Sequence, residues 1–324
     1  MKTAMKNITL SLATILAMSA AAVGGASAEE TITLGTVGSG SALNWPLLVA
    51  LDKGFFEKNN VKIDLVTAPS SAAVQQQVAA GSVDMGSGGL VDPIRAIDKG
   101  ASISIIRIEA KAAPYALYVK PEIADYAALK GKTIMVGGAK DITRIYLERM
   151  AEPNGLHQGD YDLIYAGATS ARFAALQSGA VDGALISAPF NFQAETSGMK
   201  NLGVTVDYVK DFPFTGYAVN VDWAKDHKPA IQGFLAGYSQ AVTWLADPAN
   251  REEAVNVLIK DTSAKPDDAQ KTYDFFKKLD IYDAEGSVDK VGLGKLLDIM
   301  KGLGDLEGSA DPDRFYNATI LAKD

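Results

Sequence analysis

Hydrophobic and polar residues follow two different spacings along this chain, and together these spacings predict a mixed α/β protein. Apolar and polar residues alternate over residues 31–36, which is typical of a half-buried strand. Behind Pro46, Leu47, Leu51 and Phe55 recur at the spacing of one helix face. Further strands are predicted at 61–66, 102–108 and 133–136, with helical segments interleaved. Later segments are helical and begin with proline or serine: 229–246, 248–260, 266–278 and 287–303.

One short pattern occurs twice. Residues 81–93 (GSVDMGSGGLVDP) and residues 176–189 (LQSGAVDGALISAP) both contain Gly-x-Val-Asp after a helix-like stretch, so Gly81 and Gly179 are expected to end helices in the left-handed conformation. Strands are predicted after the glycines at 83–86 and 181–186, followed by small-residue turns at 87–89 and 187–189. Ligands of open α/β sheets bind beyond the carboxyl ends of strands, so the repeat predicts two lobes facing one cleft. Chance recurrence of common helix–strand sequence is the alternative.

Two small-residue loops precede predicted helices, one in each half of the chain. Residues 38–41 (Gly-Ser-Gly-Ser) lead to Asn44, a candidate helix cap, and residues 137–140 (Gly-Gly-Ala-Lys) lead to Asp141. Backbone N–H groups at such helix starts can hold an anion or a carbonyl. The simpler interpretation is a tight turn followed by a cap; if the second helix start faces the cleft, Thr143 is the expected donor. The spacing matches neither a dinucleotide nor a phosphate-loop motif.

Charged residues gather at the end of the predicted strand 102–108, where Arg107 is followed by Glu109 and Lys111. Such bunching is typical of a solvated rim, and this interpretation is favoured. The alternative is that Arg107 reaches the cleft.

Composition narrows the classes of function. The formal net charge of −8 offers no basic surface for nucleic acid, and the absence of cysteine rules out disulfides, thiolate metal sites and a thiol nucleophile. Both histidines, His157 and His227, lie in polar connections. We therefore expect no catalytic residues, no metal site and no cofactor.

The first residues have the pattern of a secretory signal. Lys2 and Lys6 precede an apolar stretch at 8–18, and Ala26-Ser27-Ala28 fits a cleavage site. We expect residues 1–28 to be removed after Ala28 and the mature chain to be periplasmic.

Several segments in order carry a family resemblance: GSGSALNWPLLVALDKGFFEKNNVKIDLV, QQQVAAGSVDMG, LKGKTIMVGGAKDITRIYLERM and LQSGAVDGALISAPF. The mature chain resembles the ABC-transporter substrate-binding proteins of the nitrate, sulfonate, taurine and thiamine-precursor group. The resemblance implies a type II periplasmic binding fold, with two α/β lobes joined by two crossovers. We expect residues 29–113 plus 217–324 to form lobe 1 and residues 114–216 to form lobe 2.

By position, the resemblance also implies the ligand contacts. They are Ser39, Asn44, Trp45, Gly88, Gly89, Asp141, Thr143, Ser187, Pro189 and Phe190, with Arg107 as the candidate basic residue for an anion. The acidic Asp92 and Asp141 depart from what a small dianion would prefer. An aromatic or zwitterionic ligand stacked on Trp45 or Phe190 is therefore the alternative to an anion.

The function implied is capture without chemistry. We expect a monomeric solute-binding component of an ABC importer that closes on a small anion, of the sulfonate, nitrate or aromatic carboxylate class, and delivers it to a membrane permease and its ATPase. Two alternatives stay open: an enzyme on the same scaffold, and a ligand-sensing module for a membrane receptor.

Overall fold

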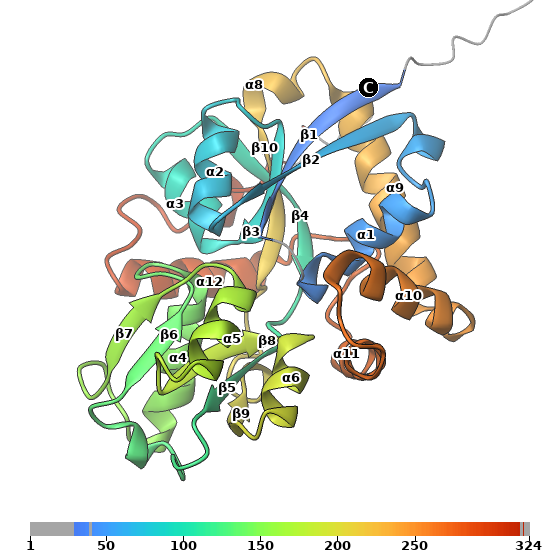
Figure 1. Ribbon diagram of the computed structural model, residues 1–324. Helices are drawn as coiled ribbons and strands as arrows, with labels where there is room; N and C mark the ends of the chain where they lie inside the picture. Colours follow the sequence, from blue (N-terminus) through green and yellow to red (C-terminus); the bar gives the residue numbers. More distant parts are fainter. Residues whose placement is uncertain (1–28, 39–40, 318–319, 321–324) are drawn as a thin grey trace, which may run out of the picture.

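Two five-stranded sheets with the same strand arrangement form the framework of the molecule (Figure 1). The computed structural model describes residues 29–38, 41–317 and 320, so the expected signal peptide and Ser39 lie outside the described residues. The first sheet has the order β2-β1-β3-β10-β4, and the second has the order β7-β6-β8-β5-β9. The strands of the first sheet are β1 (Glu30–Val37), β2 (Val61–Ala68), β3 (Met85–Gly89), β4 (Ile103–Ala110) and β10 (Thr215–Asn220). Those of the second are β5 (Tyr115–Val119), β6 (Thr133–Val136), β7 (Asp162–Tyr165), β8 (Gly183–Ser187) and β9 (Lys200–Val204).

Strand direction is also the same in both sheets. In the first, β1 pairs in parallel with β2 and β3, and β10 runs antiparallel to β3 and β4. In the second, β6 pairs in parallel with β7 and β8, and β5 runs antiparallel to β8 and β9. Each sheet therefore contains one inner strand that runs antiparallel to both of its neighbours.

Helices cover the faces of both sheets, and most of the long C-terminal helices gather beside the first (Figure 1). They are α1 (Trp45–Asp52), α2 (Ser71–Ala79), α3 (Val91–Asp98), α4 (Ile142–Ala151), α5 (Thr169–Gln177), α6 (Phe190–Thr196), α7 (Thr205–Tyr208), α8 (Val221–Ala224), α9 (Lys228–Ala246), α10 (Arg251–Thr262), α11 (Pro266–Leu279) and α12 (Lys290–Gly302).

One hydrophobic cluster runs through both sheets. It combines Ile94 of α3 and Ile105 of β4 with Leu117 of β5 and Tyr146 of α4. Helix α12 joins the same cluster through residues that include Leu297, and Figure 1 shows this helix at the level where the two sheets meet. A second cluster lies between the first sheet and α1, α9, α10 and α11. The two sheets are therefore held together by buried apolar surface as well as by the connecting chain.

The sequence predicted the framework well and its details less well. Strand 133–136 and the left-handed glycines are confirmed, with φ of +69° at Gly81 and +78° at Gly179. Residues 87–89 are not a turn, because they continue β3 and pair with β10. Helix α3 begins at Val91, and Asp92 is buried in its first turn.

The connections between the sheets fall near the expected crossovers. The chain leaves the first sheet after Ala110, enters the second at Tyr115, and returns at Thr215. We propose that the two sheets mark two lobes divided as expected, with residues 29–113 plus 217–324 in lobe 1 and residues 114–216 in lobe 2.

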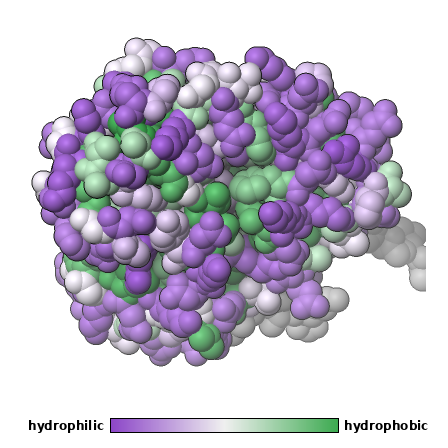
Figure 2. Space-filling view, turned by 90° about the horizontal axis from the view of Figure 1, so that it is seen from below, coloured by the Kyte–Doolittle hydropathy of each residue, from purple (hydrophilic) through white to green (hydrophobic). Residues whose placement is uncertain are grey.

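The surface is largely hydrophilic. The face in Figure 2 shows apolar residues only in patches between charged and polar ones. Within the described part of the chain, no helix combines the length and the apolar content needed to span a bilayer.

Candidate functional site

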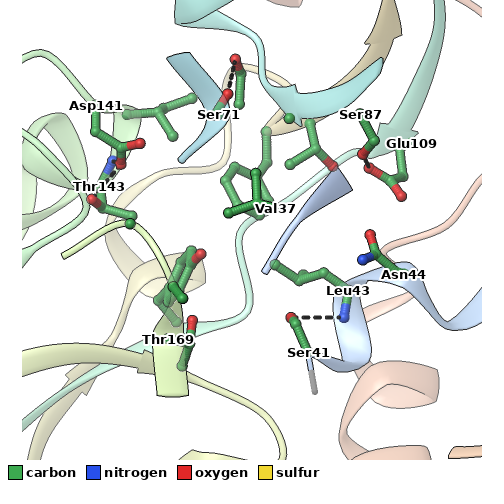
Figure 3. A pocket seen from close by; sticks show the side chains of 18 of the residues that line it. Val37, Ser41, Leu43, Asn44, Ser71, Ser87, Glu109, Asp141, Thr143 and Thr169 are labelled. Atoms are coloured by element: carbon green, nitrogen blue, oxygen red, sulfur yellow. Dashed lines mark hydrogen bonds between the residues drawn. The ribbon is translucent and has the colours of Figure 1, made fainter. Parts of the chain in front are cut away.

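A pocket of about 70 Å³ lies between the two sheets and is lined by residues from both (Figure 3). Figure 3 shows Asp141 and Thr143 on one side of the pocket and Ser87, Glu109 and Asn44 on the other. Its lining combines loops, strand ends and helix starts, as expected for a ligand site in an open α/β sheet.

Glu109, near the end of β4, supplies a buried carboxylate to the pocket and is 2% exposed. Its Oε2 accepts a hydrogen bond from the Ser87 hydroxyl at 2.6 Å, and its Oε1 accepts one from the Tyr217 hydroxyl at 3.2 Å. Burial raises the pKa of Glu109, while the hydroxyls of Ser87, Thr215 and Tyr217 and the charge of Arg107 oppose that rise. The sequence indicated a solvated rim here, and that prediction is wrong for β4. Although β4 lies at the edge of the first sheet, all of its residues are buried.

Asp141 caps helix α4 on the opposite side. Its carboxylate accepts from the Thr143 backbone N–H at 2.8 Å and from the Thr143 hydroxyl. That hydroxyl also accepts from the backbone N–H of Gly137 at 2.7 Å. The capping interpretation of Asp141 is therefore confirmed, and both polar groups of Thr143 already have partners within the protein.

A buried arginine supports the wall formed by α5. The Arg172 side chain is 0% exposed and donates to the carbonyls of Ala166, Gly167 and Leu185 at 2.7–2.8 Å. Its Nη2 donates to the Thr169 hydroxyl at 2.9 Å, and that hydroxyl lies 3.2 Å from the hydroxyl of Ser187. Thr169 lines the pocket, whereas Ser187 lies behind it.

A second buried acid lies close to the pocket. Asp92 of α3 is 6% exposed, and one of its oxygens accepts from Arg95 at 3.0 Å. Burial, and then the nearby charge of Asp141, raise the pKa of Asp92 to about 6. Carboxylates from α3 and α4 therefore oppose each other where the two sheets meet.

Six of the residues expected from the sequence line this pocket: Asn44, Gly88, Gly89, Asp141, Thr143 and Phe190. Ser39 lies outside the described residues. Pro189 and Ser187 are absent from the lining, and so are Trp45 and Arg107.

Trp45 and Arg107 point away from the pocket because each has partners elsewhere. The Trp45 indole is 1% exposed and donates to the carbonyl of Ala254 at 3.0 Å, among the C-terminal helices. The Arg107 guanidinium donates to the carbonyls of Asp283, Ala284 and Glu285 at 2.6–3.4 Å. Arg107 is 1% exposed and holds carbonyls at 283–285, so its expected solvated position is wrong, and it does not line this pocket.

Sequence reasoning missed several lining residues. These include Ser41, Ser71, Ser87, Glu109, Tyr115, Thr169 and Thr215. A usable signal existed for two of them, since Ser71 and Thr169 each begin the helix before a Gly-x-Val-Asp segment. Glu109 had no such signal, because sequence spacing does not reveal which hydroxyls surround a carboxylate.

The lining is acidic. Over the described residues it includes the carboxylates of Glu109 and Asp141 and no lysine or arginine. No group of three or more histidine, aspartate or glutamate side chains suited to a metal is found in the part of the chain that the structure describes. His227 is paired with Glu30 at 2.7 Å, away from the pocket.

The two halves come close to each other at two glycines that line the pocket. A methyl group on Gly167, which follows β7, would lie 2.3 Å from the carbonyl oxygen of Pro69, which follows β2. A methyl group on Gly89 would similarly lie 3.0 Å from Ile142 of α4. Both distances are below ordinary van der Waals contact, so the structure has the two sheets closed on each other.

Comparison with known proteins identifies the family. The model of the family described as NMT1/THI5 like matches residues 44–251. The chain belongs to the NMT1/THI5-like family. The match spans residues of both sheets from Asn44 through β10, and it leaves out β1 and the pocket-lining residues Val37, Ser41 and Leu43.

Sequence relatives of this NMT1/THI5-like chain include both binding proteins and enzymes by name. A putative aliphatic sulfonates-binding protein of Escherichia coli (strain K12) is 28% identical over 267 residues, covering 79% of each chain. A 4-amino-5-hydroxymethyl-2-methylpyrimidine phosphate synthase of Uromyces fabae is 22% identical over 230 residues, covering 64% of this chain and 66% of the relative.

Solved structures confirm the fold expected from the resemblance. The alkanesulfonate-binding protein SsuA from Xanthomonas axonopodis pv. citri superimposes with a TM-score of 0.73 at 18% identity, covering 90% of this chain and 97% of that one. The periplasmic nitrate-binding protein NrtA from Synechocystis PCC 6803 gives a TM-score of 0.72 at 17% identity, covering 91% and 87%. This NMT1/THI5-like chain therefore has the periplasmic binding protein fold.

Proposed function

We propose that this chain is the solute-binding component of an ABC importer, which captures a small molecule between its two lobes. The observation that carries the proposal is a small pocket whose walls come from both sheets, with strand ends and helix starts facing inward. A ligand that contacts both walls binds the closed form more tightly than the open form, and so shifts the population toward closure.

The mechanism is closure of one lobe on the other. In the closed arrangement Gly89 lies against Ile142, and Gly167 lies against Pro69. Opening separates these contacts and exposes Glu109 and Asp141 to solvent, where the ligand enters. A membrane permease recognises the closed form, and its ATPase supplies the energy of transport.

The proposal includes a location and an assembly state. Residues 1–28 direct export and are removed, and the mature chain acts in the periplasm as a monomer. Support comes from the charged and apolar pattern of those residues and from the periplasmic location named for the structural relatives.

The chain binds its ligand unchanged in this proposal. His227 is paired with Glu30 and His157 is exposed, so neither histidine is placed to move a proton in the pocket. The synthases among the relatives by name favour a second candidate, an enzyme acting on a small metabolite. Recovery of the bound compound by mass spectrometry separates the two: an unaltered ligand supports binding alone, and a product formed on incubation supports the enzyme.

The test of closure uses the Gly167→Ala variant of the mature protein. The added methyl group meets the backbone of Pro69 and Ser70 in the other lobe, so we expect the variant to fold but to remain open and to bind its ligand weakly. Gly302→Ala is the matched control, since a methyl group there meets no atom within 4 Å. Solution scattering should show that ligand compacts the wild type and the control but not Gly167→Ala. A wild type that keeps its dimensions with its tightest ligand contradicts the proposal.

A further inference from the structure

We infer that the ligand presents a hydrogen-bond-donating nitrogen group to Glu109, as an ammonium, amidinium or amino-substituted ring does, and is not an anion. This inference rests on the proposed function, because it specifies the ligand class of the same pocket. It departs from the anionic ligand that the resemblance implies.

The first argument is the remaining acceptor capacity of Glu109. An ionised carboxylate has about four lone-pair positions. Ser87 donates to one oxygen at 2.6 Å and Tyr217 donates to the other at 3.2 Å, and the Thr215 hydroxyl also favours the ionised form, all from within the first sheet. Because Glu109 also lines the pocket, at least one acceptor position remains for a donor that arrives from the pocket side. A carboxylate surrounded by hydroxyl donors is suited to a ligand that also donates.

The second argument is the balance of charge around the pocket. Glu109 and Asp141 line it from opposite sides, and the described lining contains no basic side chain. The two buried arginines nearby are already committed: Arg107 to carbonyls at 283–285, and Arg172 to carbonyls at 166, 167 and 185 and to Thr169. An anion would enter a desolvated site beside two carboxylates without a cation to pair with, which is strongly unfavourable. A cation or a neutral N–H donor is instead attracted by the two carboxylates.

The third argument is the nature of the remaining walls. Leu43, Ile142, Phe190 and Phe214 give the pocket an apolar side, and Tyr115 adds a third aromatic ring. Aromatic faces attract cations and pack well against flat apolar groups. With a volume of about 70 Å³, the pocket is much smaller than the several hundred Å³ of sites for drug-sized ligands. The ligand is therefore a small nitrogen compound with a compact apolar part.

The experiment compares ions of matched shape and opposite charge. The probes are guanidinium and nitrate, acetamidinium and acetate, and benzamidinium and benzoate, each at millimolar concentration with the mature protein. Calorimetry and thermal shift measure binding. We expect the cation of at least one pair to bind, and the cation of every binding pair to be preferred by at least about tenfold, as for a charge-assisted hydrogen bond in a desolvated site.

Glu109→Gln tests the residue itself. The substitution keeps the shape of the side chain and removes its charge, so we expect the preference for the cation to fall at least about tenfold. The matched control is Glu195→Gln. Glu195 accepts from the hydroxyl of Tyr118 at 2.6 Å, but it lies outside the pocket lining. This control should retain the preference.

Several results would overturn the inference. They are tighter binding of the anion in any pair, no binding of any of the three cations, and an unchanged preference in a folded Glu109→Gln variant. If that variant fails to fold, the comparison of paired ions on the wild type still decides. An anion that binds tightly and compacts the protein would refute the ligand class and leave the proposed capture function standing, whereas a wild type that no bound ligand compacts would refute the capture function.

Discussion

The helix–strand pairs α2–β3 and α5–β8 occupy equivalent places in the two sheets, but the helix packs on the strand in a different way in each. Ser71 begins α2 and Thr169 begins α5, and both side chains line the pocket. The Ser71 hydroxyl lies 3.5 Å from the carbonyl oxygen of Gly89, and the Thr169 hydroxyl lies 3.2 Å from the side-chain hydroxyl of Ser187. In both halves, the first hydroxyl of the helix reaches the end of the following strand.

The strands differ in how closely the helix approaches. A methyl group on Gly88 of β3 would lie 2.3 Å from the Ser71 hydroxyl oxygen, and one on Gly86 would lie 2.4 Å from Val74. Strand β8 instead carries Ala184 and Ile186, and the helix position that corresponds to Val74 is taken by Arg172. One half of the site is therefore built by close backbone packing, and the other by a buried guanidinium that holds carbonyl groups. Shared topology does not require a shared way of shaping the pocket.

The largest expected effect comes from removing that guanidinium. Arg172→Met leaves the carbonyls of Ala166, Gly167 and Leu185 without their donors, and each unmet buried acceptor costs about 1–3 kcal/mol. We expect the free energy of unfolding to fall by about 3 kcal/mol or more, measured by urea denaturation. Val74→Ala, at the equivalent helix position, removes only apolar contact and should cost less. Equal losses in the two variants would contradict the contrast between the halves.

The next effect depends on pH. Asp92 has a folded-state pKa of about 6 against an ordinary value of 3.8, so the folded protein binds this proton more tightly than the unfolded chain does. The stability gained from protonation is complete below the ordinary pKa and is lost as the pH rises through about 6. We expect Asp92→Asn to exceed the wild type by up to about 3 kcal/mol at neutral pH, and by nothing below about pH 4. Unfolding free energies across this pH range test the expectation, and a constant difference would refute it.

The smallest expected effect tests the close approach in the first half. Gly88→Ala places a methyl group against the Ser71 side chain and should cost about 1–3 kcal/mol, as overpacking usually does. The double variant Ser71→Ala with Gly88→Ala removes the nearest oxygen and should recover part of the loss. Additive losses in the double variant would show that the two residues are not in conflict.

The sequence predicted the features that neighbouring residues decide, and it missed those that residues far away along the chain decide. Gly81 and Gly179 were predicted because a helix end is decided by its own neighbours, and both have positive φ. Asp141 was predicted as a cap for the same reason.

Long-range partners decided the residues that were placed wrongly. Arg107 turned toward carbonyls at 283–285, and Trp45 toward Ala254, and no local spacing shows where those segments lie. Glu109 was missed as a pocket residue because its partners, Ser87 and Tyr217, come from two other strands of the sheet. Some of the positions that the resemblance implied, such as Asn44, Gly88 and Thr143, border this pocket, but the resemblance could not give its charge.

The apolar cluster that runs through both sheets has a consequence for how the protein folds. Ile94, Leu117, Tyr146 and Leu297 share it, although they come from segments on both sides of each crossover. Either half expressed by itself would present this surface to water, and would be expected to aggregate. The intact chain should melt in one cooperative transition, because neither sheet keeps a complete interior once the other is lost.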